Sequence, residues 1–178
     1  MGEVELRLAT RLLHPKLTVL ISAGRGKGNV MTAAWITPVS AMPPLLAVAV
    51  SPRRYTYELI VDQKEFAVNV PTLDMLGVVD YCGSVSGREV DKVTELGLIT
   101  SEAREVNVPL IGGCVSYLEC RLRDRFEVGD HVLMIGEVVR AYVKDEFFKE
   151  VYDITKFKPV IHLGSDYYCT TSPKVITI

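Results

Sequence analysis

The sequence lacks the features that define several classes of protein. Its 178 residues carry a net charge of −2, and a chain without a basic field is not expected to bind nucleic acid. No apolar run approaches the ~20 residues needed to span a bilayer, and the charged N-terminal stretch has no signal-peptide core. We therefore expect a cytoplasmic protein with no membrane partner.

Side chains for metal or nucleophilic chemistry are also scarce. The four cysteines and three histidines form no C-x-x-C pair and no histidine pair at ligand spacing, so we predict no metal site. The G-x-S-x-G motif of a serine nucleophile is missing too. Cys114 and Cys120 are an even number of residues apart in a strand-like run, and we expect both on one side of that strand as buried hydrophobic residues.

The glycine-rich stretch at residues 23–28 does not match a nucleotide-binding loop. Gly24, Gly26 and Gly28 are spaced as G-x-G-x-G, and no serine or threonine follows Lys27. Residues 30–39, which come next, contain β-branched and aromatic types that favour a strand over a helix. We predict a tight hairpin between strands at residues 17–22 and 30–39.

The rest of the chain alternates short apolar runs with turn residues. We predict further strands at residues 45–50, 66–70, 116–128, 131–139 and 160–163. Short helices are expected to begin at Ser51-Pro52 with Ser51 as N-cap, at Thr72, and at Asp91. Because the order is not β-α-β, these elements predict a mainly β (α+β) fold, an antiparallel barrel with short inserted helices, in a single domain over residues 1–178.

Hydroxyl, basic and small residues gather in three stretches, GNVMTAAW at 28–35, SPRRYT at 51–56 and GSVSGREVDK at 83–92. The second, with Arg53 and Arg54, lies at an expected helix N-terminus, where free N–H groups and the helix dipole favour an anion. The third adds the donors Ser84, Ser86, Arg88 and Lys92. Each stretch alone is typical of an ordinary cap or solvated turn.

Together these stretches, with FAVNVP at 66–71, DYCGS at 80–84 and GDHVLMIGEV at 129–138, resemble the flavin reductase-like FMN-binding split barrels. The branch they resemble is that of flavoredoxin and the archaeal ferric-reductase-like flavoproteins, and the blocks keep their order over almost the whole chain. The resemblance implies an antiparallel split β-barrel that forms a homodimer, with one FMN per subunit near the dimer interface.

The resemblance also implies which residues contact FMN. The strand expected along the flavin ring supplies Asn29, Met31, Thr32, Ala33, Ala34 and Trp35. The phosphate or ribityl chain is expected near Ser51, Arg54 and Thr56. A loop expected to close over the phosphate end supplies Cys82, Gly83, Ser84, Ser86, Arg88 and Lys92. His131 is expected toward the flavin or the nicotinamide as a candidate catalytic residue.

The implied activity is that of an oxidoreductase in which NADH or NADPH reduces bound FMN, which then reduces free flavin, a ferric complex or a redox partner protein. One alternative is an electron carrier without efficient NAD(P)H oxidation, and another is a split barrel without flavin that binds haem or a protein. At the residue level, Trp35 fits a core position equally well, and His131 a hydrogen bond within the sheet. Cys82 fits a buried neutral thiol better than a redox group, and His14 and His162 fit structural or surface positions.

Overall fold

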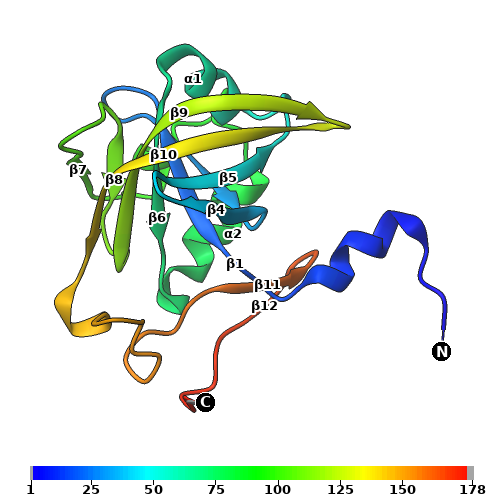
Figure 1. The fold of residues 1–178 in the computed structure, drawn as a ribbon. Coiled ribbons are helices and arrows are strands. Elements are labelled where there is room, and N and C mark those ends of the chain that lie inside the picture. The colour runs from blue at the N-terminus through cyan, green and yellow to red at the C-terminus, as the bar shows by residue number, and fades with distance from the viewer. Residues whose placement is uncertain (1, 176–178) are drawn as a thin grey trace.

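A seven-stranded antiparallel sheet forms the centre of the computed structural model, which describes residues 2–175 (Figure 1). The strand order is β3-β2-β6-β9-β10-β5-β4. Their bounds are β2 Val19–Ala23, β3 Asn29–Ala33, β4 Ile36–Ala41, β5 Pro44–Val50, β6 Glu65–Val70, β9 Ser116–Val128 and β10 His131–Val143. Strands β3 and β4 form the two ends of this order, so the curved sheet is an open barrel. The mainly β, split-barrel prediction is confirmed.

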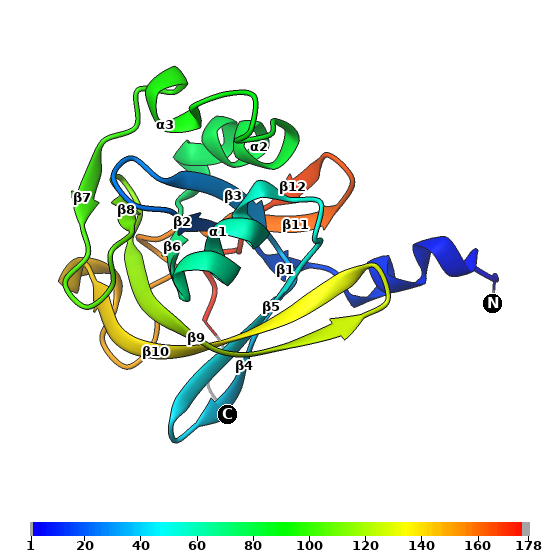
Figure 2. The same ribbon diagram turned by 90° about the horizontal axis from the view of Figure 1, so that it is seen from above.

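Smaller elements surround the sheet. Two small sheets contain β1 Lys16–Leu17, β11 Ile161–Gly164 and β12 Tyr167–Cys169, and β7 Thr100–Glu102 and β8 Pro109–Ile111. The helices are α1 Tyr55–Gln63, α2 Leu76–Ser84 and α3 Lys92–Glu95, with 3-10 turns η1 Leu6–Leu13, η2 Leu73–Met75 and η3 Asp145–Phe147. All three α-helices contact β3 (Figure 2). That strand is therefore the one on which the helical segments converge.

The two predicted hairpins are confirmed. Strand β2 pairs with β3 across residues 23–28, where Gly24, Gly26 and Gly28 all have positive φ. Strands β9 and β10 pair across the turn at Gly129, whose φ is +60°, with two shifts of register along the ladder. Glycine adopts this backbone conformation without the steric cost that a side chain would add.

The strand predicted at residues 30–39 is wrong as a single element. It divides at Ala34 and Trp35 into β3, which pairs with β2, and β4, which pairs with β5. The chain thus leaves one end of the sheet at Ala33 and joins the other at Ile36. A composition rich in strand formers could not reveal this change, because both halves are strands.

Two helix predictions need correction. Helix α1 begins at Tyr55, so Ser51 is not its N-cap; the Ser51 hydroxyl instead accepts a hydrogen bond from the Arg53 N–H at 3.4 Å within a turn. Thr72 precedes the 3-10 turn η2, and α2 follows at Leu76. The helix expected at Asp91 is confirmed, since the Asp91 carboxylate accepts from the Thr94 N–H at 3.0 Å.

The prediction that Cys114 and Cys120 share one face of a strand is also wrong. Both are buried, but β9 begins only at Ser116, after Gly113 with its φ of +88°. The two thiols consequently belong to different hydrophobic clusters, Cys114 with Leu20 and Val30, and Cys120 with Phe66 and Met134.

One buried carboxylate fixes a long connection to the sheet. Glu119 on β9 is fully buried and accepts hydrogen bonds from the N–H groups of Arg104, Glu105 and Val106 at 3.0, 2.6 and 3.2 Å. The Tyr142 hydroxyl donates to it at 2.5 Å. A buried charge is tolerable only when it is hydrogen-bonded in this way, so Glu119 determines where the segment between β7 and β8 lies.

Residues 2–175 contain neither a membrane-spanning helix nor a cluster of metal ligands. None of the helices there is both long and apolar enough to cross a membrane. That part of the chain also contains no group of three or more histidine, cysteine, aspartate or glutamate side chains placed to hold a metal ion.

Candidate functional site

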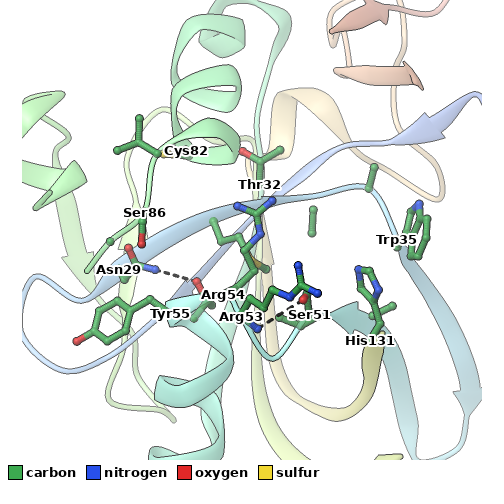
Figure 3. A pocket seen from close by; sticks show the side chains of 18 of the residues that line it. Asn29, Thr32, Trp35, Ser51, Arg53, Arg54, Tyr55, Cys82, Ser86 and His131 are labelled. Carbon is green, nitrogen blue, oxygen red and sulfur yellow. Dashed lines mark hydrogen bonds between the residues drawn. The ribbon is translucent and has the colours of Figure 1, made fainter. Parts of the chain in front are cut away.

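A cleft of about 580 Å³ opens beside β3, between the start of α1, the end of α2 and the start of β10 (Figure 3). Its volume is in the range of about 300–1,000 Å³ that is typical of small-molecule sites. It brings together thirteen of the predicted site residues: Asn29, Met31, Thr32, Ala33, Ala34, Trp35, Ser51, Arg54, Thr56, Cys82, Ser86, Lys92 and His131. Four segments far apart in the sequence, at residues 29–35, 51–56 and 82–92 and at His131, therefore meet at one site.

Strand β3 forms one wall of the cleft. Ala33 and Ala34 present only methyl groups there, so a flat ligand can approach the backbone closely. The Thr32 hydroxyl donates to the Val79 carbonyl of α2. Thr32 therefore ties α2 to the wall and has its hydroxyl proton engaged within the protein.

Asn29 and Thr56 form a buried polar pair at one end of the cleft. The Asn29 amide donates to the Thr56 hydroxyl at 2.8 Å, and the two side chains are 5% and 1% exposed. Accepting this bond leaves the Thr56 O–H free to donate to a ligand. The Asn29 amide oxygen faces Gly87 so closely that a Cβ added to Gly87 would lie 2.0 Å from it.

Lys92 is a buried cation in the cleft wall. It is 4% exposed, and its ammonium donates to the carbonyls of Val30 and Cys82 at 2.9 and 2.8 Å. Among residues 2–175 no carboxylate forms an ion pair with it. Burial lowers the pKa of Lys92. A buried, unpaired cation is costly, and an anionic ligand would compensate it.

Two adjacent arginines enter the cleft in different directions (Figure 3). Arg54 reaches toward α2, where its guanidinium donates to the Gly83 carbonyl at 3.3 Å. Arg53 turns toward Ser51 and His131. The turn that carries both is held by Arg88, which donates to the Arg53 carbonyl at 2.8 Å.

Trp35 and His131 form the other end of the cleft (Figure 3). Trp35 is 41% exposed, so it is not a core residue. Its ring centroid lies 4.9 Å from that of His131, with the rings tilted by 36°. His131 Nδ1 is 2.7 Å from an Asp130 carboxylate oxygen, and this hydrogen bond lowers the pKa of Asp130. This contact engages Nδ1 of the imidazole and leaves Nε2 outside the hydrogen bond with Asp130.

Cys82 lines the cleft as a buried thiol. Burial raises its pKa to about 11, although the nearby Lys92 ammonium works in the opposite direction. The thiol is consequently neutral at physiological pH, which agrees with the expectation of a non-redox cysteine.

Three predicted site residues do not line the cleft. Gly83 contributes its carbonyl to Arg54, and the Ser84 hydroxyl donates to the Asp80 carbonyl at 3.0 Å. Arg88 forms an ion pair with Glu58 at 2.5 Å and lies over the Tyr55 ring. Their polar groups are used to hold the segments around the cleft, a role that the sequence does not distinguish from ligand binding.

Several residues that line the cleft were not predicted from the sequence. These are Ala49, Val50, Tyr55, Val85, Gly87 and His162. Gly87 and Val85 belong to a stretch already recognised as polar and glycine-rich. His162 was expected to be structural, and no local signal could place it here, because only the pairing of β11 with β1 brings it to the cleft.

The residues present fit FMN. None of the lining residues in the described chain is acidic, whereas Arg53, Arg54 and Lys92 are cationic. A phosphate monoester carries a charge of about −1.5 to −2 at neutral pH, which suits the unpaired Lys92. The small side chains of β3 and the rings of Trp35 and His131 suit a broad, flat ring system. The free hydroxyl proton of Thr56 adds a donor near the cationic end.

Comparisons with known proteins agree with this chemistry. Residues 11–168 match the family described as flavin reductase like domain. An uncharacterized protein of Archaeoglobus fulgidus is 41% identical over 160 residues, covering 90% of each chain. An NADH-dependent FAD reductase of Streptomyces globisporus is 29% identical over 128 residues, 71% of this chain and 69% of that one. The structure of a flavoredoxin from Methanosarcina acetivorans superposes with a TM-score of 0.89 at 30% identity, covering 99% of this chain and 94% of the other.

Proposed function

The chain belongs to the flavin reductase-like family, and from this premise we propose that it is an FMN-dependent oxidoreductase. In this proposal NADH or NADPH supplies electrons to FMN in the cleft beside β3, and the flavin passes them to free flavin, a ferric complex or a redox partner protein. The observation that carries the proposal is the cleft itself. Its wall of small residues leads to the buried Lys92, which has no carboxylate partner among residues 2–175.

The protein's own contribution is binding and orientation. Lys92, Arg54 and Thr56 hold the phosphate end, since they combine two cations with a hydroxyl donor. Ser86 and Ser51 also line the cleft, and Ser51 shapes the turn before α1. The backbone of β3 supports the ring, with Trp35 and His131 at its far end. When bound, FMN would supply the hydride and electron chemistry.

His131, beside Trp35 at the ring end of the cleft, is placed to hold or deliver a proton there. Its Nδ1 contact with Asp130 fixes the orientation of the imidazole, and the opposite nitrogen is the one available to a ligand. We assign it this role because a two-electron reduction of many acceptors also consumes protons.

The alternative is an FMN-binding electron carrier without efficient NAD(P)H oxidation. The structural match to a flavoredoxin supports this alternative, whereas the match to an NADH-dependent FAD reductase supports the reductase. A cytoplasmic location stays a prediction from the sequence.

We further propose that the protein is a homodimer. The support is the exposure of large apolar side chains: Trp35, Val39 and Met42 are 41%, 49% and 93% exposed, and Phe126 and Val128 are 52% and 60% exposed. Exposed apolar surface on a protein often marks an interface. Because Trp35 also lines the cleft, an interface that includes Trp35 would lie next to the flavin.

Binding of FMN to variants of the cleft tests the site. Arg54→Ala and Thr56→Ala are each expected to weaken FMN binding, measured by quenching of flavin fluorescence on titration with protein. Ser84→Ala is a matched control, because the Ser84 hydroxyl points to its own helix and not to the cleft. Unchanged FMN affinity in both cleft variants would contradict the assignment of the phosphate end.

A further inference from the structure

The cationic charge of the cleft exceeds what one FMN phosphate requires. Arg53, Arg54 and Lys92 contribute three positive charges, and none of the lining residues in the described chain is acidic. The phosphate of FMN offers a charge of about −1.5 to −2. A flavin-loaded cleft would therefore keep roughly one positive charge that the phosphate does not neutralise.

Arg54 belongs with Lys92. The Arg54 guanidinium reaches the Gly83 carbonyl at the end of α2, and Lys92 Nζ reaches the Cys82 carbonyl one residue earlier. The two cations lie close enough that Arg54 contributes to lowering the pKa of Lys92, after the larger effect of burial. Together they form the cationic end at which a single phosphate is held.

Arg53 lies apart from this pair. Its side chain turns toward Ser51 and His131 (Figure 3). Its positive charge also helps to lower the pKa of Asp130, just before β10, after the larger effect of the hydrogen bond with His131. Within residues 2–175 its guanidinium donates no hydrogen bond and forms no ion pair, while its backbone carbonyl is fixed by Arg88. Arg53 therefore places a free guanidinium on the side of the cleft that faces His131, on a turn whose backbone is held by Arg88.

We propose that Arg53 binds an anionic group of the second ligand, the one that exchanges electrons with FMN. This inference rests on the proposed function. A guanidinium favours phosphate and carboxylate oxygens because it can donate two parallel hydrogen bonds. The same chemistry fits the diphosphate of a pyridine dinucleotide and the carboxylates of a chelated ferric ion, so Arg53 selects for an anionic donor or acceptor over a neutral one.

The test compares Arg53→Gln with Arg54→Gln in the FMN-loaded protein. ADP-ribose represents the dinucleotide diphosphate without its reactive ring, and citrate represents the chelate. Binding of each is measured by isothermal titration at low and at moderate salt, and FMN affinity is measured separately by fluorescence. Arg25→Gln is the control, since it removes the same charge from the exposed turn between β2 and β3, outside the cleft lining.

We expect Arg53→Gln to weaken the binding of one of the two anions by roughly tenfold or more, which corresponds to the loss of a charged hydrogen bond. FMN affinity should change little. Loss of ADP-ribose binding identifies the donor as the ligand of Arg53, and loss of citrate binding identifies the acceptor. Arg54→Gln is expected to show the reverse pattern, with weaker FMN binding as the main effect.

Two outcomes would overturn the inference. One is unchanged binding of both anions by Arg53→Gln, or failure of both anions to bind the flavin-loaded wild-type protein. The other is a loss of FMN affinity as large as that of Arg54→Gln, which would make Arg53 part of the flavin phosphate site. Failure of the wild-type protein to bind FMN is read from the fluorescence titration alone; it would overturn the proposed function, and this inference with it.

Discussion

Gly87 is the residue at which one methyl group would disturb the cleft most. A Cβ there would lie 2.0 Å from the Asn29 amide oxygen and 3.1 Å from Tyr55 Cδ1. Either the 85–88 segment must then move, or the Asn29 side chain must move and lose its buried hydrogen bond to Thr56. We predict that Gly87→Ala weakens FMN binding by roughly tenfold, the equivalent of about one hydrogen bond, in a fluorescence titration.

Gly77→Ala is the matched control for that substitution. Gly77 lies in the exposed first turn of α2 with open space around its Cβ position. Alanine is expected to raise the free energy of unfolding by up to about 1 kcal/mol through helix propensity, and to leave FMN affinity unchanged. Equal effects of the two substitutions on FMN binding would contradict the role assigned to Gly87.

Lys92 provides a second prediction at this scale. Lys92→Met removes the buried ammonium while keeping a side chain of similar length, so FMN affinity should fall at least tenfold. The free energy of unfolding of the protein without flavin should change little, because relief of an unpaired buried charge offsets the loss of hydrogen bonds to Val30 and Cys82. Flavin titration and urea unfolding measure the two effects. Full FMN affinity in Lys92→Met would show that the phosphate is held elsewhere.

The sequence predicts residue types at the site better than it predicts their roles. Asn29, Thr56 and Lys92 were recognised as donors and do line the cleft. Arg88 is equally polar but pairs with Glu58. Trp35 is exposed, although the sequence alone is equally compatible with a core position for it. Such differences depend on contacts between segments distant in the chain, so a local pattern does not contain them.

At the scale of elements, the segment between β7 and β8 depends on one carboxylate. Burial alone would raise the pKa of Glu119, but the hydrogen bonds from Arg104, Tyr142, Glu105 and Val106 outweigh that effect and lower it. We predict that Glu119→Gln lowers the free energy of unfolding at pH 7 by about 2–3 kcal/mol, since an amide cannot replace a charged acceptor for several N–H groups.

The pH dependence of that difference follows from the direction of the shift. A carboxyl group with a lowered pKa in the folded state stabilises the fold fully above its ordinary value of 4.5. This contribution is lost as the pH falls through the lower folded-state value. The difference in the free energy of unfolding between wild type and Glu119→Gln, measured by urea unfolding, should therefore become smaller below pH 4.5. A gap that is constant from pH 7 to pH 3 would contradict the ionised, hydrogen-bonded state of Glu119.

Elements were predicted well where periodicity and turn residues agree, as in the β9–β10 hairpin. They were predicted poorly where tertiary contacts replace a local rule. Ser51-Pro52 has the composition of a helix start, yet the helix begins at Tyr55, because the turn before it is held by Ser51 and Arg88. That displaced start is what points Arg53 and Arg54 into the cleft.

At the scale of the whole molecule, the exposed apolar side chains, Trp35, Met42 and Phe126 among them, predict a dimer. We expect light scattering at micromolar concentration to give twice the chain mass of 19.8 kDa. The chain mass alone, at the same concentration, would contradict the homodimer.

The central claim, that this chain is an FMN-dependent oxidoreductase, is tested most directly by the visible spectrum of the purified protein, recorded anaerobically before and after addition of NADH and then NADPH. Bound flavin should absorb near ~450 nm, and at least one nucleotide should bleach that band, because the reduced ring has lost it. A yellow protein bleached by neither nucleotide would contradict the reductase and leave the electron carrier. A protein that takes up no flavin when FMN is supplied would contradict the account as a whole.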